Sequence, residues 1–222
     1  MGCTIMNLLS YAPLIVQGTL MTLAAWLVAG LCSFVIGTTL GILSCRHLAS
    51  DSFSTAVRVY TFIAKGIPAY VQILIAYFVF PAAFGINIPG FIAAVGALAF
   101  CSSGYVTEIV RSGINSIPRG QWDACFVLGY PMKATLFRII LPQTFKNILP
   151  TLLGEFEQLL KSTSLLASIG ITELTRTGMN IISRELNPIP VYLMIACIYL
   201  VFSAVLQSII IMTEAKGQRG NY

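Results

Sequence analysis

Two glutamates and a lysine stand close together in an apolar part of the sequence. Glu155, Glu157 and Lys161 fall within residues 148–169, which otherwise read as a membrane-spanning helix. A charge buried in a bilayer costs at least about 2.5–3.5 kcal/mol on insertion scales and usually marks a functional position. Glu157 and Lys161 are four residues apart, so on a helix they share a face with Ser164 nearby and can form an ion pair. Two interpretations remain open: the pair locks helices together, or its face lines a path for a polar solute.

A second group of polar residues surrounds a proline in another apolar stretch. Pro68 is expected to kink its helix and free a carbonyl, and an opened carbonyl beside the cation of Lys65 suits the wall of a watery cavity. Lys65 can instead extend its amine to the membrane surface. Glu108 and Arg111 are three residues apart and are expected to form an interfacial ion pair, with Tyr105 one turn deeper and facing the path.

Signatures of catalysis and of nucleotide or metal binding are missing from the sequence. It has no GxxxxGK[ST] loop, nucleophile elbow or HExxH motif, so we predict no catalytic residue and no cofactor on this chain. His47 is the only histidine, and the six cysteines form no CxxC pair. We therefore predict no metal site, and we interpret the cysteines as small buried apolar residues.

The composition indicates that lipid rather than water surrounds most of the chain. Hydrophobic residues make up 57% of the chain and charged residues only 9%, against about 25% in typical soluble domains. A helix needs about 20 apolar residues to cross a bilayer. Gly37 and Gly41 have the GxxxG spacing of close helix contact and are interpreted as packing residues. We predict an all-α integral membrane protein with five membrane-spanning segments, at residues 14–44, 59–80, 91–110, 148–169 and 190–212.

The basic residues predict the orientation of these segments. Cytoplasmic loops of membrane proteins carry an excess of Lys and Arg. With five spans, the opposite side would carry only Arg176 and Arg184. We therefore predict an external N-terminus and a cytoplasmic C-terminus. The residues on the predicted cytoplasmic side are Arg46, Arg58, Arg111, Arg119, Lys133, Arg138, Lys146, Lys216 and Arg219.

Residues 111–146 form the longest predicted cytoplasmic segment and have a regular pattern. Pro118 suits the first turn of a helix, where its missing N–H costs nothing. Gly129 can end this helix in a left-handed conformation. Pro131 can open a second helix that runs towards Pro142. The pattern predicts two short helices joined by a sharp bend.

The first of these helices has an apolar face, formed by Trp122, Cys125, Phe126 and Gly129 at helical spacing. Three explanations for this face remain open from the residues alone. It can pack on the ends of the protein's own spans, lie at the lipid interface, or dock a partner.

The spacing of this segment resembles the EAA loop of ATP-binding-cassette importer permeases. The matching pattern is Asp123-Ala124-Cys125, then Gly129 after three residues, then Ile139-x-Leu141-Pro142 after nine. Two more segments, 116–122 and 159–165, resemble the branch of that family that takes up polar amino acids. Lys65-Gly66-Ile67-Pro68 with Gln72, and the stretch from Tyr105 to Arg111, also resemble this branch.

The resemblance implies a fold, partners and roles. The fold would be that of type I (MetI-like) importer permeases, with a transmembrane domain at 14–213 and a coupling loop at 111–146. Two permease chains, identical or different, would sit on two cytoplasmic ATPase subunits that bind ATP and Mg²⁺. A periplasmic or external binding protein would deliver an amino acid such as arginine, histidine or glutamine across a bacterial inner (plasma) membrane.

The resemblance also assigns candidate residues to coupling and to the solute path. Coupling to the ATPase would involve Trp122, Asp123, Ala124, Cys125, Phe126, Gly129, Ile139, Leu141 and Pro142. The substrate path would involve Lys65, Gln72, Tyr105, Glu157, Lys161 and Ser164.

Two other functions compete with this interpretation. An ion-coupled secondary transporter would explain the charges within the membrane but not the ordered loop. A non-transporting membrane scaffold would explain the loop but would give Lys65, Glu157 and Lys161 no role.

Overall fold

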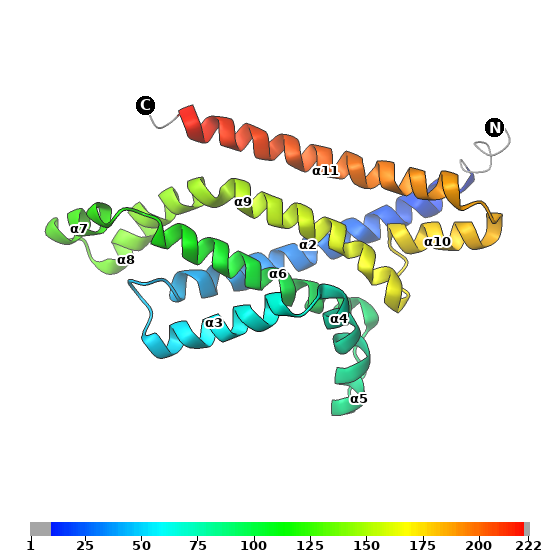
Figure 1. Cartoon of the computed structure of the whole chain (residues 1–222), viewed down its shortest axis with the longest axis horizontal. Helices are drawn as coiled ribbons and strands as arrows, with labels where there is room; N and C mark the ends of the chain where they lie inside the picture. Colours follow the sequence, from blue (N-terminus) through cyan, green and yellow to red (C-terminus); the bar gives the residue numbers. More distant parts are fainter. Residues whose placement is uncertain (1–9, 220–222) are drawn as a thin grey trace. The chain divides into compact units, whose positions relative to one another are not determined.

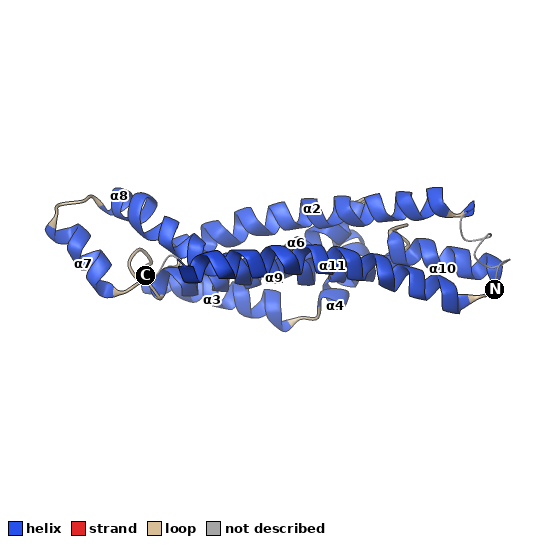
Figure 2. Cartoon of the chain, turned by 90° about the horizontal axis from the view of Figure 1, so that it is seen from above, coloured by secondary structure: helices blue, strands red, loops and turns tan. Residues whose placement is uncertain are grey.

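The computed structural model describes residues 10–219, and they form helices joined by short turns. No strand occurs within this range (Figure 2). The α-helices are α2 (Ala12–Leu43), α3 (Asp51–Gly66), α4 (Ala69–Leu74), α5 (Phe80–Phe84), α6 (Gly90–Asn115), α7 (Arg119–Val127), α8 (Met132–Ala134), α9 (Leu141–Ser162), α10 (Leu174–Glu185) and α11 (Pro188–Arg219), labelled in Figure 1. Two π-helical turns, Ile75–Val79 and Thr135–Ile140, and a 3₁₀ turn, Thr163–Ile169, complete the helical segments.

Three helices in the described part of the chain are long and apolar enough to cross a membrane. They are Ala12–Leu43, Gly90–Asn115 and Pro188–Thr213, and they coincide with three of the predicted spans. Asp51–Gly66 and Ala69–Phe84 count as a fourth span only if the bent pair is taken together. The segment 148–169 lies in α9 and the 3₁₀ turn, whose charged side chains keep it outside this group. The count of five spans therefore stays a prediction.

The segment 59–80 is predicted to be one span with a kink at Pro68, and the structure breaks the helix at this position into two. Helix α3 ends at Gly66, and α4 starts only at Ala69 after an extended Pro68 with φ −55° and ψ 136°. The amide of Gln72 donates a 2.7 Å hydrogen bond to the carbonyl of Ile67. The side chain thus satisfies a backbone acceptor at the break, so the chain can separate there into two helices.

The chain divides into two compact units. Unit 1 contains residues 10–31, 67–99 and 156–206 of the described range, and unit 2 contains residues 32–66, 100–155 and 207–219. Helices α2, α6, α9 and α11 each contribute one part to unit 1 and the other part to unit 2.

Unit 1 contains two apolar clusters. In the first, Trp26 of α2 donates a 2.8 Å hydrogen bond from its indole nitrogen to the carbonyl of Phe156. The second joins α10 to α11, where a Cβ added to Gly178 would lie only 2.0 Å from Cδ1 of Ile195. The buried residues of the two clusters include Ala25, Ala29, Ile73, Leu98, Leu159 and Leu166, and Leu174, Ile181, Val191 and Ile195.

Unit 2 has one core that extends from α2 to α9. Gly37 and Gly41 lie against Val106 and Val110 of α6: an added Cβ would come within 2.6 Å and 2.7 Å of the two valine Cβ atoms. The packing predicted from the GxxxG spacing is therefore confirmed. The buried residues of this core include Cys45, Ile114, Ile117, Trp122, Leu136, Ile140, Ile148 and Leu152.

Candidate functional site

Helix α7 begins and ends as its sequence predicts. It starts directly after Pro118 and ends before Gly129, which has a left-handed φ of +73°. The N–H of Tyr130 donates to the carbonyl of Cys125, and the N–H of Gly129 donates to that of Phe126, both at 3.0 Å. These two bonds satisfy carbonyls that a helix end leaves free. The sharp bend is thus built by one glycine and two backbone hydrogen bonds.

The second part of the segment differs from the prediction. It begins after Pro131 as expected, but it does not end near Pro142. Helical residues continue from Met132 through the π-helical turn Thr135–Ile140 into α9. A π-helical turn widens the backbone directly before Pro142, and the other π-helical turn precedes Pro81 in the same way. The extra room reduces the clash of each proline ring with the preceding turn. One continuous rod therefore leads from the bend into α9.

The apolar face predicted on α7 does not exist as one face. Trp122 is only 7% exposed and Cys125 is also buried, whereas Phe126 is 85% exposed. Val127 and Leu128, which the sequence pattern did not single out, are exposed as well. We call Phe126, Val127 and Leu128 the α7 tip. It places exposed apolar side chains at the C-terminal end of α7, where the described part of the chain does not cover them.

Trp122 is buried because residues distant in sequence cover it. Its ring stacks on that of His47, with centroids 3.9 Å apart and planes 16° apart. The preceding residue, Arg46, donates from its backbone N–H to Oδ1 of Asn115 at 3.1 Å. The α2–α3 loop therefore holds α7 in place. Of the three explanations for Trp122, packing on the protein itself is the one that the structure shows.

The other candidate coupling residues fall into two groups. Leu141 is buried and Ile139 packs against the unit 2 core, so these two support the rod. Asp123, Ala124 and Pro142 are exposed. A pocket of about 470 Å³ lies beside the α7 tip. Its lining residues are His47, Trp122, Asp123, Phe126, Tyr130, Met132 and Thr135.

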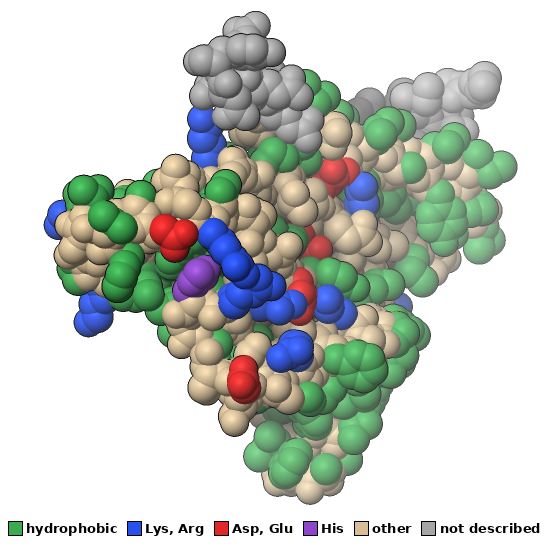
Figure 3. Space-filling view, turned by 60° about the vertical axis from the view of Figure 1, so that its left-hand side comes forward, with side chains coloured by type: hydrophobic (Ala, Val, Ile, Leu, Met, Phe, Trp, Pro, Cys, Tyr) green, Lys and Arg blue, Asp and Glu red, His purple; other side chains and the backbone are tan. Residues whose placement is uncertain are grey.

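Basic side chains are abundant in unit 2. Figure 3 shows Lys and Arg side chains gathered on one face, with Asp and Glu side chains interspersed among them. In unit 1 the basic residues between positions 10 and 206 are Lys161, Arg176 and Arg184. Those of unit 2 up to residue 155 are Arg46, Arg58, Lys65, Arg111, Arg119, Lys133, Arg138 and Lys146.

The predicted polar group of unit 2 is assembled around Glu108. Its carboxylate pairs with Arg111 and accepts a 3.0 Å hydrogen bond from Thr61 of α3. The amine of Lys65 lies 5.9 Å from the centre of the Tyr105 ring, within the range of a cation–π contact. The ion pair expected between Glu108 and Arg111 is therefore present, and Lys65 and Tyr105 are brought together beside it.

Glu155 also belongs to unit 2, and its carboxylate is hydrogen-bonded within the protein. It accepts a 2.8 Å hydrogen bond from the hydroxyl of Ser102 on α6, and its side chain is partly buried. This contact links α9 to α6.

In unit 1 the predicted ion pair of α9 is formed. Lys161 Nζ lies 2.7 Å from Glu157 Oε1, with the lysine side chain 49% exposed and the glutamate side chain 15% exposed. Ser164 donates to the carbonyl of Lys161 at 2.8 Å, so its hydroxyl is used locally. Gln72 is buried and bonded to Ile67, which gives this candidate a structural role. Lys161 is thus the most accessible charged group of the unit 1 candidates.

Sequence reasoning missed a buried carboxylate in unit 1. Glu173 is fully buried and accepts hydrogen bonds from the backbone N–H groups of Thr175 and Arg176, at 2.8 and 2.7 Å, so it caps α10. The hydroxyl of Tyr199 also donates to it. Burial raises the pKa of this carboxyl, and the backbone donors lower it in part. An acidic residue directly before a helix is a recognisable cap signal that was available in the sequence.

Comparisons with known proteins agree with this geometry. Residues 37–215 match the family described as binding-protein-dependent transport system inner membrane component. A putative glutamine transport system permease protein of Rickettsia conorii is 33% identical over 202 residues, covering 91% of this chain and 92% of the relative. An arginine transport system permease protein of Bacillus subtilis is 32% identical, with 92% of each chain covered.

Solved structures show the same fold. The crystal structure of an amino acid ABC transporter with histidines has a TM-score of 0.86 at 32% identity, covering 95% of this chain and 97% of that chain. An inward-facing MetNI methionine ABC transporter has a TM-score of 0.75 at 18% identity, covering 92% and 98%. The second likeness concerns the fold alone.

Proposed function

Since this chain belongs to the family of binding-protein-dependent transport system inner membrane components, we propose that it carries a polar amino acid inward by alternating access. It is a permease subunit of an ATP-binding-cassette importer and works with an ATPase subunit. Glutamine and arginine are proposed as substrates because the relatives are named for them, and histidine because the sequence resembles that type as well. The energy comes from hydrolysis of ATP, which the separate ATPase binds together with Mg²⁺.

The α7 tip is the observation that carries this proposal. Burial of apolar surface contributes about 25 cal/mol per Å², so three exposed apolar side chains at one helix end favour a protein partner that covers them. We propose that a groove of the ATPase is that partner. Binding there would use Phe126, Val127 and Leu128 as anchors, with Asp123 at the rim.

A displacement of the tip would be transmitted to the other helices of unit 2. Trp122 is buried in the unit 2 core, so α7 cannot shift without moving what packs on it. The continuous helical segment from Met132 to Glu155 gives a second connection within unit 2. Closure of the ATPase on ATP would displace α7 and shift the balance between inward-facing and outward-facing states.

The charged groups of α3, α6 and α9 are proposed to line the solute path. A free amino acid carries both charges, so its carboxylate suits Lys161 and its ammonium suits Glu157, both in unit 1. The half-exposed side chain of Lys161 is available for such contact, although it already pairs with Glu157. When the solute replaces the Glu157–Lys161 pair by its own carboxylate and ammonium, each of the two side chains keeps a partner of opposite charge.

The remaining partners follow from the same proposal. A second permease chain would complete the pathway, and a binding protein would deliver the solute at the external side. The chain would cross a bacterial inner membrane several times, with its C-terminus in the cytoplasm.

Reconstituted vesicles containing the permease and its ATPase test the function. Uptake of labelled glutamine, arginine and histidine is measured with ATP, without ATP, and with ATP plus an ionophore. We expect uptake that needs ATP and survives the ionophore. Uptake that is independent of ATP and abolished by the ionophore would establish the ion-coupled alternative instead. Absence of any uptake would favour the scaffold.

A further inference from the structure

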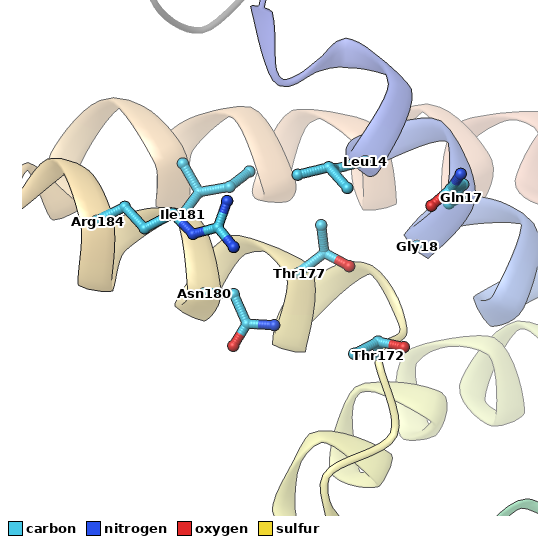
Figure 4. A pocket seen from close by; sticks show the side chains of 8 residues that line it. All are labelled: Leu14, Gln17, Gly18, Thr172, Thr177, Asn180, Ile181 and Arg184. Atoms are coloured by element: carbon cyan, nitrogen blue, oxygen red, sulfur yellow. The ribbon is translucent and has the colours of Figure 1, made fainter.

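A pocket of about 200 Å³ in unit 1 lies outside all the sites described above. Residues of α2 and α10 line it, together with Thr172 from the loop before α10, as Figure 4 shows. Leu14 and Ile181 supply apolar wall, and the remaining side chains of the lining are polar apart from Gly18. The predicted orientation places residues 171–187 at the external side, so we expect the pocket to open there.

Three polar residues of α10 face this pocket from one side of their helix. Thr177, Asn180 and Arg184 follow one another at spacings of three and four residues, which places them on one helix face. All three belong to the lining of the pocket and are labelled in Figure 4. Thr177 is buried, whereas Asn180 and Arg184 are exposed. A hydroxyl, an amide and a guanidinium can therefore contact one small molecule.

Arg184 has no acidic partner in the part of the chain that the structure describes. The neighbouring carboxylate of Glu185 accepts a hydrogen bond from the hydroxyl of Tyr11. The carboxylate of Glu173 is occupied by backbone N–H groups of α10. Both ion pairs among the described residues lie elsewhere, at Glu108–Arg111 and Glu157–Lys161. The guanidinium of Arg184 thus forms no ion pair among the described residues.

Gly18 sets the depth of the pocket. A Cβ added to this residue would lie 2.5 Å from Oγ1 of Thr177 and 3.2 Å from the carbonyl of Glu173. Helices α2 and α10 approach closely here only because no side chain intervenes. A larger residue at position 18 would displace Thr177 and alter the floor of the pocket.

We propose that this pocket binds the carboxylate of a free amino acid before the solute enters the membrane path. This inference rests on the proposed function and adds a second, external site to it. The guanidinium of Arg184 can hold a carboxylate through two parallel hydrogen bonds, and the Asn180 amide and Thr177 hydroxyl can donate to the same group. The small volume and the single charge fit one free solute molecule.

Binding of L-glutamine and L-arginine to the detergent-purified permease–ATPase complex tests the proposal. It is measured calorimetrically, without binding protein or ATP, and compared with binding of L-glutaminamide and L-argininamide, which lack the carboxylate. We expect Arg184→Gln to weaken amino acid binding about tenfold or more. Binding of the amides should be weak in both proteins. Arg176→Gln is the matched control, because Arg176 lies on the same helix but does not line the pocket.

The outcomes separate this inference from the proposed function. Equal binding to the wild-type and Arg184→Gln complexes, alongside ATP-driven uptake, would overturn the inference and leave the function intact. If Arg184→Gln lowered only the stimulation of ATP hydrolysis by the binding protein, the carboxylate would belong to that protein and the inference would be wrong. Asn180→Ala should weaken binding less than Arg184→Gln, and equal yields of folded complex would exclude misfolding.

Discussion

The α7 tip and the charged face of α9 depart from ordinary protein surfaces in opposite ways. At the tip, Phe126 and its neighbours expose apolar side chains at the C-terminal end of a short helix. On α9, Glu157 and Lys161 place charges in a segment predicted to cross the membrane, and the lysine is half exposed. The first arrangement favours a protein partner and the second favours a polar solute or an aqueous cavity. Placing both in one chain is what a coupled transporter requires.

The largest loss of uptake is expected when the apolar character of the tip is removed. We expect the double substitution Phe126→Asp with Leu128→Asp to abolish ATP-dependent uptake, because two charges cannot be buried in an apolar groove without a large penalty. Both side chains are exposed in the chain itself, so membrane insertion and thermal stability should remain unchanged. Wild-type uptake by this variant would contradict the role of the tip.

The bend that presents the tip should be the next most sensitive feature. Gly129 has a φ of +73°, and a left-handed conformation costs a residue with a side chain about 1–2 kcal/mol. We expect Gly129→Val to reduce uptake several-fold by displacing the tip, and Gly129→Asn to reduce it less, since Asn tolerates this conformation. Gly120→Val on the same helix is the control, because its φ is not positive and its Cβ would meet open space. Equal uptake by Gly129→Val and Gly120→Val would show that the bend is not required.

The charged face of α9 can be tested by exchanging its two charges. We expect Glu157→Gln and Lys161→Gln each to change the half-saturating amino acid concentration or the maximal uptake rate, by about tenfold. In the exchange variant, Glu157→Lys with Lys161→Glu, an ion pair remains possible but the charges seen by the solute are reversed. A solute path predicts that this variant stays impaired, whereas a purely structural pair predicts rescue. Uptake measured over a range of solute concentrations distinguishes the two.

The smallest expected effect concerns Leu186, an exposed residue that follows α10. Its φ of 51° places a leucine in the left-handed region, where glycine and asparagine fit better. We expect Leu186→Gly to leave uptake unchanged and to stabilise the protein by at most about 1 kcal/mol, seen as a small rise in the thermal midpoint. A loss of uptake would reveal a function for this exposed residue that differs from that of the tip.

The parts of the fold that depend on local rules were predictable. Gly129 and Pro131 fix a helix end and a helix start, and their effects depend on few neighbours. The close packing at Gly37 and Gly41 followed from their spacing, although the partner helix α6 did not, and the pair Glu108–Arg111 followed from its place on one helix turn.

The features that depend on distant residues were not predictable from periodicity. Trp122 is buried because His47, from another loop, stacks on it, and helical spacing alone grouped it with Phe126. The break at Pro68 depends on the bond from Gln72 to Ile67, and the uninterrupted rod through Pro142 depends on a π-helical turn. The pocket beside Arg184 requires α2 and α10 to meet at Gly18.

Cross-linking from the α7 tip tests the central claim most directly. Cys125 is buried and unsuited as an anchor, so a cysteine introduced at Phe126 is used in a chain whose own cysteines are replaced. We predict that it cross-links to the ATPase subunit in membranes and that the yield changes when ATP binds. Failure to reach the ATPase, or labelling of this cysteine by an impermeant reagent from outside the cell, would contradict the account.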